Sequence, residues 1–169
     1  MSSGLKYVTL DTEMGWVGIL GSDRGLLHLT LPQSSPQAAQ ELLGDRAAQA
    51  VWSPSSFSNL IERLRAYFGG YRVSFPDQLD LSGASAFQKQ VWQWVRLIPY
   101  GETRSYSWVA GQIKKPGAAR AVGQALGQNP LPVIIPCHRV VKNNGELGGF
   151  GGGVEMKQRL LKMETASGH

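Results

Sequence analysis

The sequence predicts an α/β module, an antiparallel sheet plus helices, over residues 1–80, and a mostly helical module with a helix-turn-helix over residues 81–169. Two observations predict this division. Short segments of alternating polar and apolar residues open the chain, whereas helical spacing of apolar residues dominates from Phe87 onward. Between them, residues 71–85 are polar, extended in character and rich in turn formers, as expected of a linker between two modules.

The first module begins with three alternating segments, at residues 6–11, 15–22 and 25–31, which are separated by turns containing Asp, Glu and Gly. This pattern predicts a small antiparallel sheet. Residues 35–47 have a helical composition that starts at a Ser-Pro pair, and residues 54–70 show a stronger helical pattern that a Gly-Gly pair ends. The module is therefore expected to combine a sheet with crossing helices.

The second module shows four helical segments. Apolar residues on one stripe predict a helix over residues 87–98. Ser105 can cap a short helix over residues 105–113, the sequence KKPG then forms a turn, and residues 118–128 form a further helix. This pair is a candidate helix-turn-helix, although many ordinary helical hairpins share the pattern. Residues 154–165 predict the last helix.

The second helix of the candidate helix-turn-helix consists largely of alanine and glycine, and Arg120 is its only charged residue. A helix that reads the major groove normally presents several long polar side chains. Small side chains instead suit close approach of the backbone to a narrow groove, with Arg120 as the single long probe. They suit tight packing against a neighbouring helix equally well, so both interpretations stay open at this point.

Charge divides unevenly along the chain. Residues 1–84 carry six Lys and Arg against eight Asp and Glu, whereas residues 85–169 carry eleven against four. A basic half is expected of a phosphate-binding surface, with a solvated basic face that binds nothing as the alternative. No apolar run approaches the roughly 18 residues that span a bilayer, and the N-terminus lacks the pattern of a secretory signal. We therefore expect a cytoplasmic protein, nuclear in a eukaryote, without membrane contact.

Cys137 is the only cysteine, so it cannot form an intramolecular disulfide, and with three scattered histidines it cannot supply a structural zinc site. A lone cysteine is usually inert core. This one follows Pro136 and a short apolar run, Val133–Ile135, that is expected to be a buried strand or extended segment. His138 and Arg139 come next, and such an electropositive neighbourhood lowers a thiol pKa and favours a nucleophilic thiolate.

Glycines recur between residues 145 and 153 and predict a flexible loop that a backbone or a planar base could approach closely. The loop matches neither the glycine pattern that binds dinucleotides nor a Walker loop. Neither a cofactor nor a metal ion is therefore expected.

The hexapeptide Ile135-Pro136-Cys137-His138-Arg139-Val140 resembles the active-site signature of the O6-alkylguanine-DNA alkyltransferases, also called methylated-DNA–protein-cysteine methyltransferases. The likeness extends to Ser105-Tyr106, to the run from Ala118 to Gly123, to Asn129-Pro130 and to Glu164, all in the family's order and spacing. It covers residues 85–165, about half of the chain. For the first half, which has only a compatible pattern, the resemblance implies a ribonuclease-H-like fold.

The resemblance implies DNA repair by direct reversal, in which an alkyl group moves irreversibly from O6 of a flipped guanine, or from O4 of thymine, to Cys137. It implies no cofactor, and it implies a monomer that contacts double-stranded DNA containing alkylated bases through the minor groove. Because the chain has no second thiol and a thioether has no good leaving group, we expect one turnover per molecule.

The resemblance also implies roles for four catalytic residues. Cys137 would be the nucleophile, and His138 would accept its proton through a water molecule. Glu164 would orient and polarise His138. Asn129 would brace the turn between the recognition helix and the nucleophile.

For DNA binding, the resemblance implies that Tyr106 presses on the phosphate of the target nucleotide and that Arg120 fills the space left by the flipped base. The expected DNA-contacting residues also include Ser105, Ala119, Ala121 and Gly123. The expected substrate pocket comprises Pro132, Leu147, Gly148, Gly149, Phe150 and Gly151. Phe150 and Gly151 depart from the family, which often has Tyr and then a side chain able to contact the lesion, so acceptance of bulky alkyl groups is left open.

Three other functions fit parts of the pattern. A non-catalytic relative that only binds alkylated DNA would lack the cysteine, and Cys137 argues against it. A thiol hydrolase would need an oxyanion hole, and a peroxidase would need a resolving thiol. A transcriptional helix-turn-helix regulator would leave Cys137 without a role.

Overall fold

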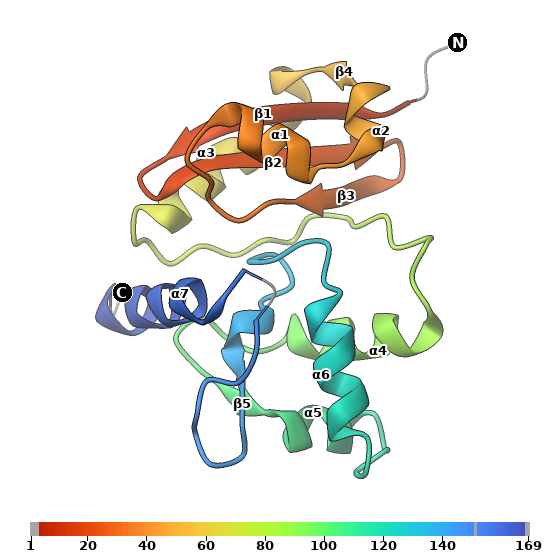
Figure 1. Cartoon of the computed structure of the whole chain (residues 1–169), viewed down its shortest axis with the longest axis vertical. Helices are drawn as coiled ribbons and strands as arrows, with labels where there is room; N and C mark the ends of the chain where they lie inside the picture. The colour runs from red at the N-terminus through yellow and green to blue at the C-terminus, as the bar shows by residue number, and fades with distance from the viewer. Residues whose placement is uncertain (1–3, 151, 168–169) are drawn as a thin grey trace. The chain divides into compact units, whose positions relative to one another are not determined.

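The computed structural model describes residues 4–150 and 152–167. The chain forms two compact units, Met1–Leu81 and Ser82–His169, whose elements are labelled in Figure 1. Within the described residues, no helix is both long enough and apolar enough to cross a membrane.

The first unit contains a four-stranded sheet with the order β3-β2-β1-β4. Its strands are β1 (Lys6–Thr12), β2 (Gly15–Ser22), β3 (Gly25–Leu29) and β4 (Val51–Trp52). The pairs β1–β2 and β2–β3 are antiparallel, which confirms the predicted antiparallel sheet. Strand β4 pairs in parallel with β1 and was not predicted, because two residues are too few to show an alternating pattern.

Helices of this unit are α1 (Pro36–Leu42), α2 (Asp45–Ala48) and α3 (Ser58–Phe68), with a 3₁₀ helix over Pro54–Phe57. The helical character of residues 35–47 is confirmed, but it is divided between two helices because the chain breaks at Gly44. That residue has a φ of 84°, a left-handed conformation that glycine adopts without steric cost and that ends α1. Ser35 caps α1 by accepting a hydrogen bond from the backbone N–H of Ala38.

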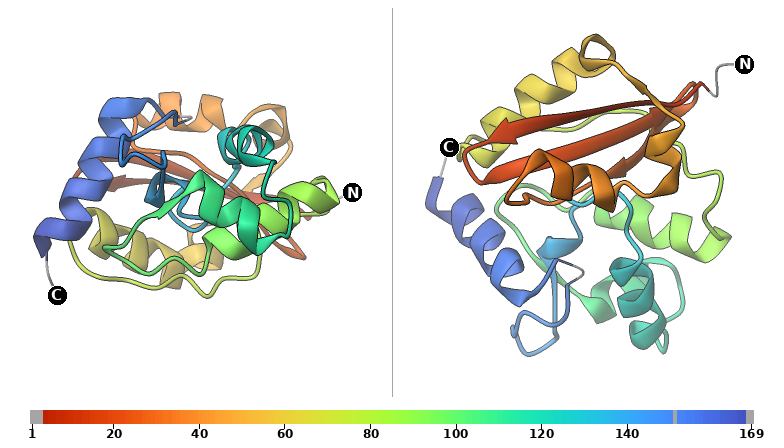
Figure 2. Two further views of the ribbon diagram at one scale, coloured as in Figure 1. Left: turned by 90° about the horizontal axis from the view of Figure 1, so that it is seen from below. Right: turned by 45° about the horizontal axis from the view of Figure 1, so that its top comes forward.

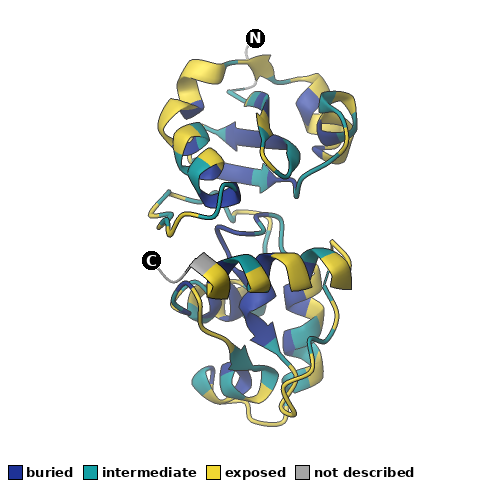
Figure 3. Ribbon diagram, turned by 90° about the vertical axis from the view of Figure 1, so that its left-hand side faces the viewer, coloured by how far each residue is buried: buried dark blue, intermediate teal, exposed yellow. Residues whose placement is uncertain are grey.

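Helices α1 and α3 lie on opposite faces of the sheet (Figures 1 and 2). Strand β2 is consequently buried on both faces, and its consecutive residues Ile19 and Leu20 are fully inaccessible. In Figure 3 the strands of the sheet are largely buried, whereas the surrounding helices carry exposed residues. The core of the first unit therefore consists of two layers of side chains, one on each side of the sheet.

Residues 71–85 were predicted to be a linker, and the structure corrects this for residues 77–80. Leu26 donates its backbone N–H to Gln78 O at 2.9 Å, and Asp80 donates its N–H to Leu26 O at 2.8 Å, so this stretch continues the sheet beside β3. Arg63 binds Asp77 through two hydrogen bonds of 2.7 and 2.8 Å. The sequence pattern missed these bonds because backbone pairing does not depend on side-chain alternation.

The second unit is mostly helical, as predicted. Its elements are α4 (Ala86–Val95), β5 (Arg104–Ser105), α5 (Tyr106–Gln112), α6 (Ala119–Gly127), a 3₁₀ helix (Cys137–Arg139), β6 (Val140–Val141) and α7 (Val154–Ser167). Ser105 caps α5 by accepting a hydrogen bond of 3.0 Å from Trp108 N, as its sequence context predicted. The short parallel pair β5–β6 was not predicted, since each strand has two residues.

Helices α5 and α6 pack against one another and against α4. Trp92 on α4 donates its indole N–H to the carbonyl of Ala125 at 2.9 Å, which satisfies a backbone acceptor in the last turn of α6. Helix α7 buries one stripe at helical spacing, formed by Lys157, Leu160 and Glu164. This stripe carries two charged side chains into the interior of the unit.

Candidate active site

The segment before Cys137 is a tight turn and not the buried strand or extended segment predicted for Val133–Ile135. The backbone N–H of Ile135 donates to Leu131 O at 2.8 Å and closes the turn. Val133 is 3% exposed and has a φ of 76°, which is strained for a β-branched residue. The apolar run is therefore buried, but its backbone reverses direction directly before the cysteine.

Asn129 links this turn to the thiol. Its amide nitrogen Nδ2 lies 2.8 Å from Ile135 O and 3.0 Å from Cys137 Sγ, and it donates to both. Its Oδ1 accepts the backbone N–H of Leu131 at 2.8 Å. One side chain thus joins the end of α6, the turn and the sulfur atom.

His138 and Glu164 form a fully buried pair. His138 Nε2 and Glu164 Oε2 are 2.6 Å apart, although 26 residues separate them in sequence. Arg139 binds the same carboxylate, with Nε 2.9 Å from Oε1 and Nη2 3.1 Å from Oε2, and donates a further bond to Ile98 O. Glu164 is therefore held by two consecutive residues of the 3₁₀ helix that Cys137 begins.

The charges of this cluster follow from burial and partners. Burial raises the pKa of Glu164, but hydrogen bonds and charges from His138 and Arg139 outweigh it and lower that pKa to about 2. Burial lowers the pKa of His138 against the opposing effect of Glu164. At neutral pH we therefore assign an ionised Glu164 and a neutral His138 that donates Nε2–H to the carboxylate, which leaves Nδ1 as the basic ring nitrogen.

The thiol of Cys137 is buried, with 3% of the residue exposed, and this burial raises its pKa to about 12. The hydrogen bond from Asn129 and the charge of Lys157 act in the opposite direction. We expected neighbouring His138 and Arg139 to lower the thiol pKa, and this was wrong. Because Arg139 is paired with Glu164 and His138 is neutral, desolvation dominates and the resting thiol is protonated.

Lys157 is a site residue that the sequence interpretation missed. It is 1% exposed, and its Nζ donates hydrogen bonds to Val140 O at 2.7 Å and to Gly149 O at 3.2 Å. Burial lowers its pKa to about 8, and the charge of Cys137 opposes that shift. Its spacing from Leu160 and Glu164 on one helical stripe was a signal that could have placed it inside.

Tyr106 and Phe150 approach this cluster from different elements. A Cβ atom added to Gly148 would lie 2.5 Å from Tyr106 Oη, and Gly148 itself has a φ of 73°, so the contact requires glycine. The Phe150 ring meets the His138 ring edge to face, with centroids 6.5 Å apart. The glycine-rich loop is thus packed on Tyr106 at one residue and on His138 at another.

Comparison with known proteins identifies the family of this chain. Residues 5–81 match the family model of the 6-O-methylguanine DNA methyltransferase ribonuclease-like domain, and residues 86–166 match that of the DNA binding domain of the same methyltransferases. The chain belongs to the 6-O-methylguanine DNA methyltransferase family. The predicted resemblance and the ribonuclease-like nature of the first half are thereby confirmed.

Individual relatives span nearly the whole chain. A methylated-DNA–protein-cysteine methyltransferase of Mycolicibacterium paratuberculosis is 41% identical over 162 residues, which are 95% of this chain and 92% of the relative. The crystal structure of Mycobacterium tuberculosis O6-methylguanine methyltransferase is 40% identical and has a TM-score of 0.81, covering 96% of this chain and 94% of the other. A structure of Mycobacterium tuberculosis OGT in complex with DNA gives the same values.

The residues that the family resemblance assigned to DNA binding lie on α5 and α6. Arg120 is exposed on the first turn of α6, where no long side chain neighbours it in sequence. Ser105 and Tyr106 are half-buried at the start of α5. The small residues Ala119, Ala121 and Gly123 are half-buried as well, whereas Gln124, one turn after Arg120, is exposed.

The residues assigned to the alkyltransferase pocket lie next to the cluster in sequence or in space. Pro132 is half-buried in the turn before Cys137 and forms a β-bridge with Ile135. Leu147 and Phe150 are half-buried, whereas Gly149 is exposed. Gly151 lies outside the described residues.

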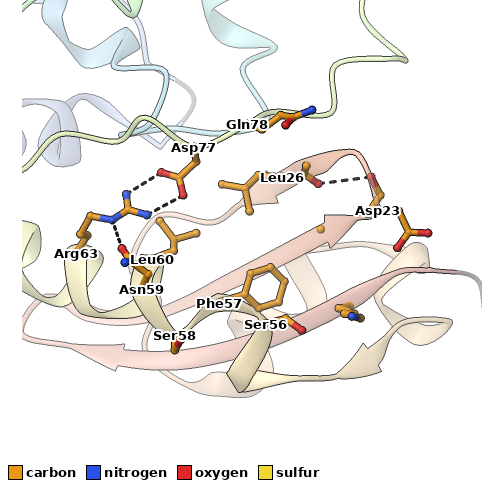
Figure 4. A pocket seen from close by; sticks show the side chains of 14 residues that line it. Asp23, Leu26, Ser56, Phe57, Ser58, Asn59, Leu60, Arg63, Asp77 and Gln78 are labelled. Carbon is orange, nitrogen blue, oxygen red and sulfur yellow. Dashed lines mark hydrogen bonds and ion pairs between the residues drawn. The ribbon is translucent and has the colours of Figure 1, made fainter.

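Away from Cys137, the described residues contain a cavity but no group of potential metal ligands. In residues 4–150 and 152–167, no group of three His, Cys, Asp or Glu side chains could hold a metal ion. The first unit has a cavity of about 510 Å³ between the β2–β3 turn and the start of α3 (Figure 4). Arg63 crosses one end of it and is bonded to Asp77 and Asn59, so its charge is already satisfied within the protein.

Proposed function

We propose that this methyltransferase repairs DNA by direct reversal: it flips an O6-alkylated guanine out of duplex DNA and transfers the alkyl group to Cys137, once per molecule. O4-alkylthymine is proposed as a second substrate. The observation that carries this proposal is the contact of 3.0 Å between Asn129 Nδ2 and Cys137 Sγ beside the buried His138–Glu164 pair. Transfer of an alkyl group to a thiol requires a nucleophile, a base and a carboxylate that orients the base.

In the reaction, the S–H proton of Cys137 passes through a water molecule to Nδ1 of His138. The sulfur then forms a bond to the alkyl carbon as the bond from that carbon to O6 breaks, and its electron pair stays on the guanine. Glu164, ionised because its pKa is about 2, stabilises the imidazolium that forms. The proton is returned to the guanine, so the products are a thioether and an unmodified base.

With a thiol pKa of about 12, Cys137 forms almost no thiolate at neutral pH unless a base accepts its proton. The relay through His138 supplies that base. The protein would therefore keep Cys137 unreactive until a substrate lies in the pocket. Asn129 supports the same step, since a hydrogen bond to sulfur is stronger to the thiolate than to the thiol. The thioether has no leaving group that water could displace, and the chain has no second cysteine that could remove the alkyl group. Each molecule would therefore react only once.

The burial of Cys137, which is 3% exposed as a residue, supports base flipping, because O6 inside a duplex cannot reach a buried sulfur. We propose that α6 lies in the minor groove, where its small residues allow close approach and Arg120 fills the vacated space in the stack. Tyr106 would press on the phosphate of the flipped nucleotide. The remaining proposed DNA contacts are Ser105, Ala119, Ala121 and Gly123.

We further propose that the protein acts as a monomer in the cytoplasm, or in the nucleus of a eukaryote, with domains at residues 1–80 and 81–169. The net positive charge of residues 85–169 supports placing the DNA contacts in the second of these domains.

Incubation with duplex DNA containing O6-methylguanine tests the function. Peptide mass spectrometry is expected to find one methyl group on Cys137 and none after Cys137→Ser. A second portion of DNA added to the methylated protein is expected to stay unrepaired. Binding of lesion DNA without any mass shift would replace the proposal by lesion recognition alone, and repeated turnover would refute the single use of Cys137.

A further inference from the structure

Two non-glycine residues among those described have a positive φ, and they stand on either side of α6. One is Val133 in the turn before Cys137, and the other is Lys114, whose φ is 62°, in the turn that joins α5 to α6. Nine glycines among the described residues also have a positive φ, so glycine is the usual residue of this chain where that conformation occurs. The lysine is therefore an exception that calls for a reason.

The hydrogen bonds around Lys114 define its position in the turn. Lys114 N donates to Gly111 O at 3.1 Å, and Lys115 N donates to Ala110 O at 2.9 Å. These are the two bonds of a Schellman motif, in which the residue after the helix cap is left-handed and is usually glycine. A lysine there carries a Cβ that opposes the left-handed conformation, and unlike asparagine it has no short polar group to compensate locally.

The side chain of Lys114 has no internal partner that would explain the choice. It is exposed, and within the described residues its ammonium forms no hydrogen bond or ion pair. The ammonium of the next residue, Lys115, lies over the Phe87 ring, 5.5 Å from the ring centroid. Lys115 therefore has a partner within the protein, whereas Lys114 has none among the described residues. Nothing in the fold of the second unit therefore benefits from a charge at Lys114.

The surroundings of Lys114 favour an anion. Residues 106–127, which comprise α5, the turn and α6, contain three basic residues, Lys114, Lys115 and Arg120, and no acidic one. Arg120, exposed on the first turn of α6, follows Lys114 by six residues. Phosphates of a nucleic acid backbone are the anions that such a surface attracts, and they bind through single lysines without sequence preference.

We propose that Lys114 binds a backbone phosphate of DNA and that its left-handed conformation is retained, at a cost in stability, to hold the ammonium at the entrance to α6. The proposal rests on the proposed function, because it assumes that α6 faces DNA. It adds a contact outside the set of residues that the family signature indicated. Strain at an exposed functional position is expected when the surrounding structure imposes the conformation.

The test uses the full chain with Lys114→Gly and Lys114→Ala, which both remove the ammonium but differ in the Cβ atom. Thermal unfolding is expected to give Lys114→Gly a Tm about 2–4 °C above that of Lys114→Ala, because glycine relieves the backbone strain. A Tm for Lys114→Gly at or below that of Lys114→Ala would overturn the assigned conformation.

DNA binding is measured by titrating a fluorescent duplex without a lesion at several salt concentrations. Both variants are expected to lower the slope of log affinity against log salt by about 0.9 and to weaken binding about eightfold near 0.1 M salt, as the loss of one phosphate contact predicts. Lys162→Ala, which removes an exposed charge from α7, is the control and is expected to keep the wild-type slope.

If both Lys114 variants kept the wild-type slope of log affinity against log salt, the proposed phosphate contact would be refuted. A slope lowered as much by Lys162→Ala would also overturn it, since the effect would then reflect net charge. These results are distinct from failure of the proposed function, in which the wild-type protein itself would neither bind the duplex nor gain a methyl group on Cys137.

Discussion

Asn129 places one amide nitrogen within hydrogen-bonding distance of both Ile135 O, at 2.8 Å, and Cys137 Sγ, at 3.0 Å. The carbonyl belongs to the turn before the nucleophile, and the sulfur is the nucleophile itself. Any movement of the turn therefore changes the hydrogen bond to the sulfur.

Asn129→Ala is expected to slow alkyl transfer from free O6-methylguanine base about tenfold, because the thiolate loses a donor. The loss of the bonds to Leu131 N and Ile135 O is expected to destabilise the fold by about 1–3 kcal/mol. Asn129→Asp keeps the acceptor for Leu131 N but places a negative charge beside the sulfur, and it should be slower than alanine. Transfer rates are measured by loss of the free base, and an undiminished rate in Asn129→Ala would refute the assigned contact.

Arg120→Ala is expected to reduce repair of O6-methylguanine in a duplex by about tenfold or more, because the extruded base is no longer replaced in the stack. The same variant should react with free O6-methylguanine base at nearly the wild-type rate, since that substrate needs no extrusion. Measuring both rates on one preparation of the variant distinguishes an effect on base extrusion from an effect on alkyl transfer itself. Equal losses on both substrates would contradict the role given to Arg120.

The Glu164 carboxylate predicts loss of stability in acid. Its pKa is about 2 in the folded protein and about 4.5 ordinarily, so it contributes stability that is complete above pH 4.5 and is lost as the pH falls toward 2. The shift corresponds to about 3 kcal/mol. Urea unfolding of wild type and Glu164→Gln at pH 6 and pH 3 measures it. The variant should be less stable at pH 6 and lose less between the two pH values, and parallel losses would speak against an ionised Glu164.

Gly148→Ala is expected to impair both the loop and the reaction, because the new methyl group would lie 2.5 Å from Tyr106 Oη at a φ of 73°. We expect a cost of about 1–3 kcal/mol, or displacement of the loop with slower transfer. Gly145→Ala is the matched control, because Gly145 has a similar φ of 87° but its Cβ would meet no atom within 4 Å. Thermal unfolding and transfer rates of the two variants should therefore differ, and equal behaviour would show that Tyr106 does not pack on Gly148.

Val133→Gly and Val133→Ala test the strained turn. Both remove the buried branches of valine, and they differ only in the Cβ atom that opposes a φ of 76°. In an ordinary buried position alanine is the more stable of the two, whereas here glycine should be more stable by about 1 kcal/mol. Denaturant unfolding gives the sign of the difference. A more stable alanine variant would show that the turn before Cys137 is not left-handed at this residue.

The sequence determined the features that depend on neighbouring residues. Alternation predicted the three long strands, helical spacing predicted the helices, and Ser105 identified the start of α5 because an N-cap acts within three residues. The motif around Cys137 indicated the nucleophile, and the basic half of the chain indicated DNA. All of these are local patterns or sums of charge.

Tertiary structure decided what those residues do to one another. The pKa of Cys137 depends on burial and on Lys157 and Asn129, and the sequence neighbours His138 and Arg139 gave the wrong direction because Glu164 engages both. Packing of α7 brings Glu164 and Lys157 to the 3₁₀ helix, and no local pattern encodes those distances. Desolvation and pairing are properties of the folded interior, so the state of the thiol could be known only from the structure.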